Sequence, residues 1–178
     1  MFIRRCLDKI LQKQINVRCE LKVLDNGKQL EGKIAVITGG GNGIGKAIAQ
    51  VFVNQGAKVV IIGRDEEKLK NTVTDLGDEC RYLVMDLTRK KDINMFFEKC
   101  ENVFSRKIDI FISNAGVYIN KALGEYVSED FDYIINSDLK SHFLLGQEYI
   151  RYCKKSNISG NMIFISSNRA VFGDYGPY

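Results

Sequence analysis

The chain has 178 residues, 45% of them hydrophobic and 27% charged, with a formal net charge of +4 at pH 7. This balance is ordinary for a globular protein, and the single proline excludes collagen-like and proline-rich classes. Five cysteines without a C-x-x-C pair favour neither a zinc site nor a disulfide framework, so we expect no metal, reduced thiols and a cytoplasmic location.

The positive charge is concentrated at the N-terminus. Residues 1–33 hold eight Lys/Arg and four Asp/Glu, whereas the remaining residues hold 18 of each sign. Binding to a nucleic-acid backbone needs a clustered basic face, so the neutral remainder argues against nucleic acid as a partner. Apolar runs are too short for a membrane span and the N-terminus lacks the apolar core of a signal peptide, so we expect no membrane partner.

We interpret residues 1–32 as a basic N-terminal extension. Apolar side chains between Phe2 and Leu11 follow helical spacing, and residues 17–23 alternate like a half-buried strand before the turn Asn26-Gly27. The helix has three interpretations: it binds a membrane surface or partner, it caps its own domain, or it is the remnant of a preceding coding segment. We favour the last two, because stable anchoring usually needs two signals.

A buried strand, a glycine cluster and an amphipathic helix then follow one another. The apolar run 34–38 leads into glycines, and a helix over 43–55 repeats apolar residues at three- and four-residue spacing. The first turn of a helix carries unpaired N–H groups and partial positive charge, and glycine lets a diphosphate approach them closely. This order predicts a dinucleotide-binding turn.

The glycine spacing fits T-G-x-x-x-G-x-G and not G-x-G-x-x-G, and here the sequence resembles the classical short-chain dehydrogenase/reductase family. The resemblance covers roughly residues 30–178. It implies a nicotinamide coenzyme, NADP with NAD as the alternative. It also implies coenzyme contacts from the turn residues Thr38, Gly39, Gly41, Asn42, Gly43, Ile44 and Gly45.

Strands and helices alternate from residue 33 onward. The expected strands are 34–38, 58–62, 81–85, 109–113 and 161–166, and the expected helices are 43–55, 65–76, 89–105 and 128–155. This alternation predicts an α/β fold, a Rossmann-like doubly wound parallel sheet, with residues 33–178 as the dinucleotide-binding domain. Ligands of such sheets bind at the carboxyl ends of the strands.

The residues after the second strand bear on the choice of coenzyme. Gly63 stands where an acid would hold the ribose 2′-hydroxyl of NAD, and Arg64 follows it. A basic side chain there can pair with the 2′-phosphate of NADP, so the pattern favours NADP; a solvated loop charge is the alternative. Asp65 lies one residue too far along and is interpreted as the N-cap of the next helix.

Two further motifs follow the third and fourth strands. Asp86-Leu87 resembles the family's adenine-binding pair, in which the carboxylate accepts from the adenine amino group; alternatively, Asp86 starts the next helical turn. Asn114-Ala115-Gly116 matches the Asn-Ala-Gly motif that steadies the central sheet beside the coenzyme in this family.

The resemblance implies hydride transfer between nicotinamide and a small-molecule carbonyl or secondary alcohol, as in 3-oxoacyl-carrier reductases. The family uses a tyrosine as acid/base, a lysine four residues later that lowers the tyrosine pKa, a serine and an asparagine. Ser167 and Tyr178 fit the serine and tyrosine better than Ser166 and Tyr175 do. The lysine position lies past the end of the sequence.

Asp138 stands where the family has asparagine. It shares a helical stripe with Phe131, Ile134 and His142, so we expect it to point inward and to be partly neutral or solvated by water. A carboxylate cannot donate as an amide does unless it is protonated, so the proton relay is altered. His142 is interpreted as a satisfied helix histidine.

The sheet is expected to be incomplete at its C-terminal edge, where the family has further strands. We therefore expect an exposed edge and marginal stability, and homo-oligomers for the full-length family more than for this chain. Three functions remain open at this point. They are an NADP-dependent oxidoreductase with a truncated sequence, a non-catalytic NADP(H)-binding module, and an inactive gene fragment.

Overall fold

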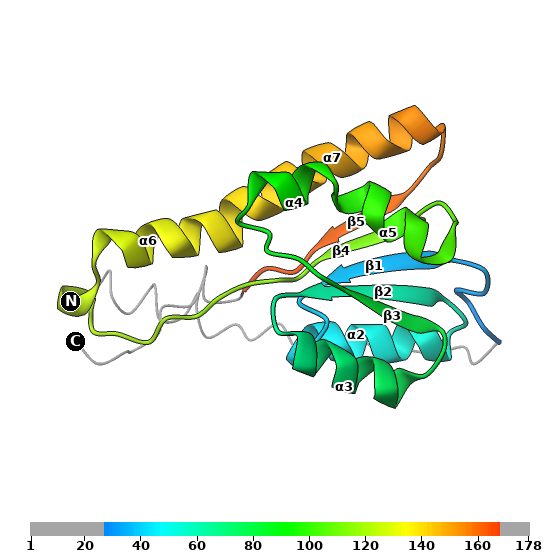
Figure 1. Ribbon diagram of the computed structural model, residues 1–178, viewed down its shortest axis with the longest axis horizontal. Coiled ribbons are helices and arrows are strands. Elements are labelled where there is room, and N and C mark those ends of the chain that lie inside the picture. The colour runs from blue at the N-terminus through cyan, green and yellow to red at the C-terminus, as the bar shows by residue number, and fades with distance from the viewer. Residues whose placement is uncertain (1–26, 168–178) are drawn as a thin grey trace, which may run out of the picture.

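A computed structural model describes residues 27–167 of the chain (Figure 1). The predicted N-terminal helix and strand lie outside the described residues, as do Tyr175 and Tyr178. Within residues 27–167, no helix is both long and apolar enough to span a lipid bilayer. The same part of the chain holds no group of three or more His, Cys, Asp or Glu arranged to bind a metal.

Five parallel strands form a single sheet in the spatial order β3-β2-β1-β4-β5. Their bounds are β1 Ile34–Thr38, β2 Lys58–Gly63, β3 Cys80–Val84, β4 Ile110–Ser113 and β5 Asn161–Phe164. Val36 of β1 pairs with Val60 of β2 on one side and Phe111 of β4 on the other. The chain thus adds strands first on one side of β1 and then on the other. This confirms the predicted Rossmann-like, doubly wound α/β fold.

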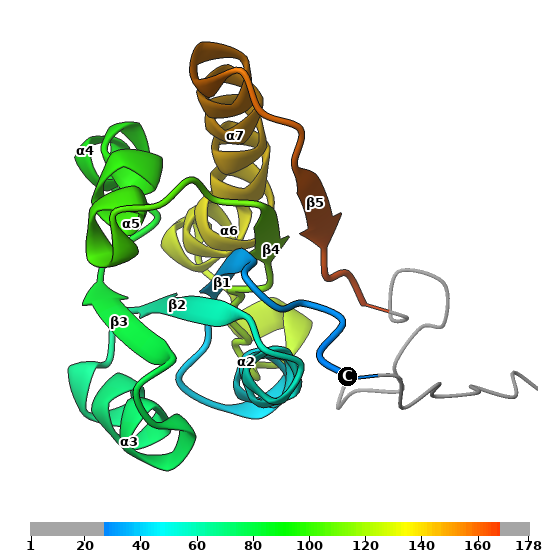
Figure 2. The ribbon, with the colours of Figure 1, turned by 90° about the vertical axis from the view of Figure 1, so that its right-hand side faces the viewer.

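Helices cover both faces of the sheet (Figure 2). One layer holds α2 (Gly43–Asn54) and α3 (Glu66–Leu76). The other holds α4 (Lys90–Asn94), α5 (Phe96–Phe104), α6 (Ser128–Ile135), the π-helical turn η2 (Asn136–Lys140) and α7 (Ser141–Ser156). A 3₁₀ turn, η1 (Leu123–Glu125), precedes α6. In Figure 1, α6 extends past the carboxyl ends of the strands, where the chain forms a wall beside the end of the sheet.

The core has one layer on each face of the sheet because successive strand residues point to opposite sides. Ile34 and Val36 pack with the aromatic side chains of α5 and α7, including Phe96. Ala35 and Ile37 pack beneath α2 and α3. All residues of β1 and β4 are buried, which explains their continuous apolar sequence.

Two predicted helices are interrupted in the structure. The helix expected over 89–105 breaks at Met95, whose φ of −102° and ψ of 3° leave the helical region. The break accompanies burial of both Phe96 and Phe97 against Phe111. The helix expected over 128–155 contains η2 between α6 and α7. A π turn spaces its hydrogen bonds five residues apart and so changes which side chains face inward.

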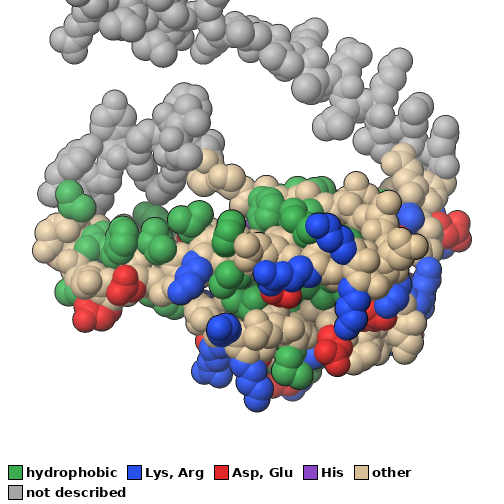
Figure 3. Space-filling view, turned by 90° about the horizontal axis from the view of Figure 1, so that it is seen from above, with side chains coloured by type: hydrophobic (Ala, Val, Ile, Leu, Met, Phe, Trp, Pro, Cys, Tyr) green, Lys and Arg blue, Asp and Glu red, His purple; other side chains and the backbone are tan. Residues whose placement is uncertain are grey.

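The predicted exposed edge is present at β5. Within the described residues β5 pairs with β4, and its Ile163 and Phe164 are each 46% exposed. Apolar side chains also gather over α6 and the start of α7 in Figure 3. Exposed aromatic residues of these two helices include Phe131 and Phe143. The predicted marginal stability stays a prediction.

Candidate functional site

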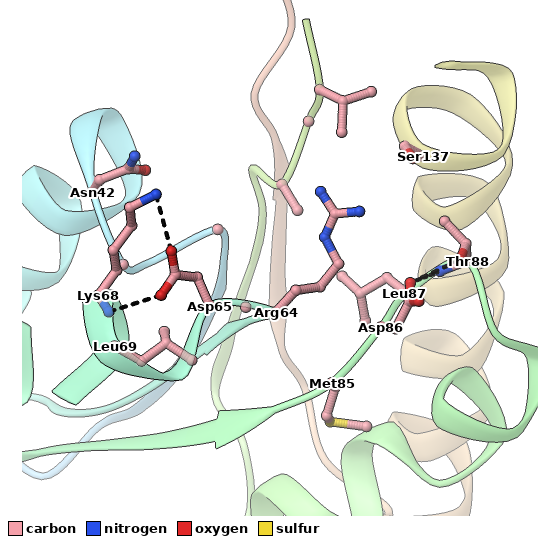
Figure 4. Close-up of a pocket in the computed structure, with 16 residues that line it drawn as sticks. Asn42, Arg64, Asp65, Lys68, Leu69, Met85, Asp86, Leu87, Thr88 and Ser137 are labelled. Atoms are coloured by element: carbon pink, nitrogen blue, oxygen red, sulfur yellow. Dashed lines mark hydrogen bonds and ion pairs between the residues drawn. The ribbon is translucent and has the colours of Figure 1, made fainter. Parts of the chain in front are cut away.

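A cleft opens at the carboxyl ends of the strands, where the chain direction across the sheet reverses between β1 and β4 (Figure 4). It encloses a cavity of about 200 Å³. Eight of the predicted coenzyme residues line it: Gly39, Gly41, Asn42, Arg64, Asp86, Leu87, Ala115 and Gly116. Six lining residues were not predicted, namely Lys68, Leu69, Met85, Thr88, Val117 and Ser137. Four predicted residues of the turn are not among the lining residues: Thr38 and Gly45 are buried, whereas Gly43 and Ile44 are exposed.

The glycine-rich turn is packed too closely for side chains. A Cβ on Gly45 would lie 2.3 Å from the carbonyl oxygen of Gly39, and one on Gly39 would lie 3.0 Å from Cα of Ala115. Gly39 and Gly43 have φ of +69° and +51°, which favour glycine. At Gly43 an added Cβ would meet nothing within 4 Å among the described residues. The turn therefore packs tightly at Gly39 and Gly45 and leaves room at Gly43.

Helix α2 begins within the glycine-rich segment. Asn42 is the N-cap residue with an extended backbone, and Ile44 in the first turn is 62% exposed. The first turn contains no acidic side chain that would neutralise the positive end of the helix dipole. An anionic diphosphate would therefore be favoured there, and the Gly39–Gly45 cradle has the close approach that such a group needs. The residues present fit a dinucleotide.

Thr38 and Asn114 join the ends of β1 and β4. The backbone N–H groups of Asn114 and Ala115 donate to Oγ1 of Thr38 at 2.8 and 2.9 Å. Nδ2 of Asn114 donates to the Thr38 carbonyl at 2.9 Å, and a Cβ on Gly45 would lie 2.7 Å from this Nδ2. The Asn-Ala-Gly segment, the glycine turn and the start of α2 thus form one packed unit that fixes the floor of the cleft.

The loop after β2 holds a basic residue, Arg64, and an acidic residue, Asp65, which do different things. Asp65 is the N-cap of α3, as predicted: its Oδ1 accepts from the backbone N–H of Lys68 at 3.1 Å. Hydrogen bonds from the Lys68 side chain and backbone lower the pKa of Asp65. Arg64 instead reaches across the cleft, where its guanidinium donates to the hydroxyl of Tyr133 on α6 and lies 5.6 Å from the centre of that ring. In Figure 4 the Arg64 side chain points into the cavity.

Asp86 takes part in a turn and also lines the cleft. Its Oδ1 accepts from the backbone N–H and the hydroxyl of Thr88 at 3.1 and 2.7 Å. Burial raises the pKa of Asp86, but the hydrogen bonds from Thr88 and the charges of Arg89 and Arg64 outweigh burial, and the net pKa is lowered. The side chain is therefore an ionised acceptor at neutral pH. These bonds agree with the interpretation of Asp86 as the start of a turn, and its role toward the adenine stays a prediction.

Comparison with known proteins decides the family. The sequence model described as short chain dehydrogenase matches residues 33–176, which is most of the chain. The chain belongs to the short-chain dehydrogenase family.

Individual proteins that are similar to this chain are also reductases by name. The 3-oxoacyl-[acyl-carrier-protein] reductase FabG of Rickettsia felis is 36% identical over 149 residues, which cover 83% of this chain and 58% of that protein. A tropinone reductase homolog of Arabidopsis thaliana is 33% identical over 141 residues, covering 78% of this chain and 52% of its own length. The chain thus spans somewhat more than half the length of these curated relatives.

Solved structures of short-chain dehydrogenases share the fold. A short chain dehydrogenase from Bacillus anthracis superposes with a TM-score of 0.76 at 30% identity, covering 83% of this chain and 60% of that one. The 3-ketoacyl-(acyl-carrier-protein) reductase from Brucella melitensis, complexed with NADH, gives a TM-score of 0.73 at 29% identity. The overlap covers 79% of this chain and 59% of the Brucella chain.

Asp138 is a correction to the sequence analysis. It was expected to point inward, but in this short-chain dehydrogenase it lies exposed on η2. Its Oδ1 accepts from the backbone N–H of Val117 at 2.9 Å. The π turn shifts the helical phase of the residues that follow α6, and Ser137 is the buried residue of η2. Phe131, on the stripe expected to face inward, precedes this turn and is 63% exposed.

His142 has both ring nitrogens occupied, as predicted. Nε2 lies 2.6 Å from the carbonyl oxygen of Ala115, and Nδ1 lies 2.9 Å from the hydroxyl of Ser113. A carbonyl oxygen can only accept, so Nε2 donates to Ala115, while Nδ1 shares the second hydrogen bond with the Ser113 hydroxyl. The histidine ties α7 to the end of β4.

Ser167 lies three residues after β5 and is exposed. It is not among the residues that line the described cavity, and its predicted partner Tyr178 lies outside the described residues. The structure thus brings eight of the predicted coenzyme residues around one cavity, and the catalytic role of Ser167 stays a prediction.

Proposed function

We propose that this chain binds NADP(H) in the cleft between β1 and β4 and takes part in hydride transfer to or from a small-molecule carbonyl or secondary alcohol. The observation that carries the proposal is the cradle in which a Cβ on Gly45 would lie 2.3 Å from the Gly39 carbonyl oxygen. It brings backbone and helix terminus close enough to hold a diphosphate. The nicotinamide of the bound coenzyme supplies or accepts the hydride; the side chains position it.

The preference for NADP over NAD is assigned to Arg64. Gly63 precedes it without the carboxylate that would bind a ribose 2′-hydroxyl, and the Arg64 guanidinium lines the cavity. A guanidinium suits a phosphate because it donates several hydrogen bonds in a planar fork. Asp86 and Leu87 line the same cavity and are proposed to bind the adenine.

The substrate class follows from the relatives. Both the Rickettsia and the Brucella proteins are named as reductases of acyl-carrier-linked 3-oxo compounds, and we propose a carbonyl substrate of that kind. Ser167 is proposed to hydrogen-bond the substrate oxygen, and Tyr178 to exchange its proton. We further propose homo-oligomers for the full-length family more than for this chain, and a cytoplasmic location, in keeping with free thiols at Cys80, Cys100 and Cys153.

A non-catalytic NADP(H)-binding module or an inactive gene fragment is the second candidate, and Asp138 favours it. The family's asparagine is replaced by a carboxylate that accepts from Val117 and cannot donate while ionised. Replacing Asp138 by Asn separates the two candidates: reduction of a 3-oxoacyl thioester by NADPH increases for an enzyme and stays at zero for a binding module or an inactive fragment.

Fluorescence titration of the 178-residue chain with NADPH and NADH tests the proposed coenzyme. Arg64→Ala should weaken NADPH binding by about 10-fold or more, the scale of a lost charged hydrogen bond, and change NADH binding little. Arg151→Ala is the matched control, since this arginine pairs with Glu148 on the surface of α7 away from the cleft. Equal loss for both coenzymes in Arg64→Ala contradicts the assignment of the 2′-phosphate.

A further inference from the structure

Ser137 carries a buried hydroxyl that has no hydrogen-bond partner among the residues that the structure describes. It lies on η2, is 9% exposed, and its Oγ contacts no donor or acceptor among residues 27–167. Among residues 27–167, it is the one buried side-chain N or O atom that has no hydrogen-bond partner. Burying a polar group without a partner is unfavourable, so such an atom in a native fold needs an explanation.

The neighbouring serine shows what a structural hydroxyl does on this helix. Ser141 is also buried, and its Oγ donates to the backbone carbonyl of Ser137 at 2.5 Å. This is the usual bond of a serine to the carbonyl one turn earlier. Ser137 makes no such bond within the described residues, although it sits on the same helical segment. Its hydroxyl is left available for another acceptor or donor.

The side chain of Ser137 lines the cleft. It borders the same cavity as Arg64, Asp86 and Leu87, and it lies one helical turn after Tyr133, which contacts Arg64. In Figure 4, Ser137 lies on the helix that closes the cleft opposite Asn42. Rotation about its Cα–Cβ bond moves Oγ among three staggered positions. A ligand in the cavity would border this residue directly.

We propose that the Ser137 hydroxyl hydrogen-bonds the adenosine half of the coenzyme, an inference that rests on the proposed NADP(H) site. The adenosine half is selected because Ser137 shares its cavity with Arg64 and Asp86, the residues assigned to the 2′-phosphate and the adenine. A ribose hydroxyl or an adenine nitrogen satisfies the serine when the ligand is bound. The residue thus adds ligand affinity at the expense of the stability of the ligand-free chain.

Calorimetric titration of the full chain with adenosine 2′,5′-bisphosphate and with NADPH tests this assignment. Ser137→Ala should weaken both ligands by about 3- to 10-fold, the effect of one hydrogen bond. The thermal midpoint of the ligand-free variant should equal or exceed that of the parent chain, since no bond is lost. Ser141→Ala, the matched control, should lower the midpoint and leave both affinities within about 2-fold.

Each other outcome overturns a defined part of the reasoning. Unchanged affinities in Ser137→Ala refute the inference alone, and so does a lowered midpoint, which would mean that the hydroxyl already has a partner. Loss of affinity for NADPH without loss for the bisphosphate refutes the adenosine assignment. Failure of the parent chain to bind either ligand, with a cooperative unfolding transition intact, refutes the proposed function itself and this inference with it.

Discussion

Thr38→Val tests the unit that fixes the floor of the cleft. Thr38 is completely buried, and its Oγ1 accepts from the backbone N–H groups of Asn114 and Ala115 at 2.8 and 2.9 Å. Valine keeps the branched shape and removes the acceptor. Each amide left without an acceptor costs about 1–3 kcal/mol when buried. Because Asn114 and Ala115 are only partly buried, we expect a total loss of about 2–4 kcal/mol in the free energy of unfolding.

Urea unfolding followed by far-UV circular dichroism measures this loss. Thr38→Ser is the control, since it keeps the hydroxyl and loses one methyl group, at a cost of about 1 kcal/mol. The valine variant should also bind NADPH more weakly, because the segment after β4 is no longer held beside the glycine turn. A valine variant within about 0.5 kcal/mol of the parent chain would refute the reasoning, since the two bonds would then contribute nothing to the fold.

Two further substitutions probe the walls of the cleft. Tyr133→Phe removes the hydroxyl that accepts from Arg64 in the ligand-free chain, so NADPH should bind about 2- to 5-fold more tightly while NADH binding stays constant. An equal change for both coenzymes in fluorescence titrations would contradict competition for the guanidinium. Asp86→Asn tests the lowered pKa: the carboxylate stabilises the fold above its ordinary pKa of 3.8, and this stabilisation disappears as the pH falls through the lower folded value. The variant should therefore be less stable than the parent at pH 7 and equally stable near about pH 2; a stability difference that persists in acid would contradict the sign of the shift.

The sheet and the glycine turn were predictable because their signals are local. Strands β1 and β2 are buried on both faces, and such strands have continuous apolar sequences that no surface strand shares. The turn at Gly39–Gly45 has glycines where a Cβ would overlap backbone atoms, as close packing of strand, turn and helix requires. The role of Asp65 as an N-cap could also be predicted, because an N-cap side chain bonds to a backbone N–H only three positions later.

The helical wall of the cleft was not predictable in the same way. The apolar stripe through Phe131 was expected to face the sheet, yet Phe131 is 63% exposed, while Ser137 is buried. An amphipathic pattern identifies an apolar face but not the surface that covers it, and α6 extends beyond the sheet. The π turn at η2 then shifts the phase of the following residues, and no residue type in Asn136–Lys140 marks it. This is why Asp138 was placed inward and Ser137 was not considered.

The cleft therefore has two parts that are held by different forces. Its floor is built from buried strand ends and from the hydrogen bonds that Oγ1 of Thr38 accepts from the segment after β4. Its helical wall is held by exposed contacts, the pair Arg64–Tyr133 and the bond from Val117 to Asp138, which are worth little in water. Changes in the floor should alter folding and the binding of every dinucleotide together. Changes in the exposed pair Arg64–Tyr133 should alter the choice between dinucleotides and leave the fold intact, since a ligand phosphate can replace an exposed contact without disturbing the core.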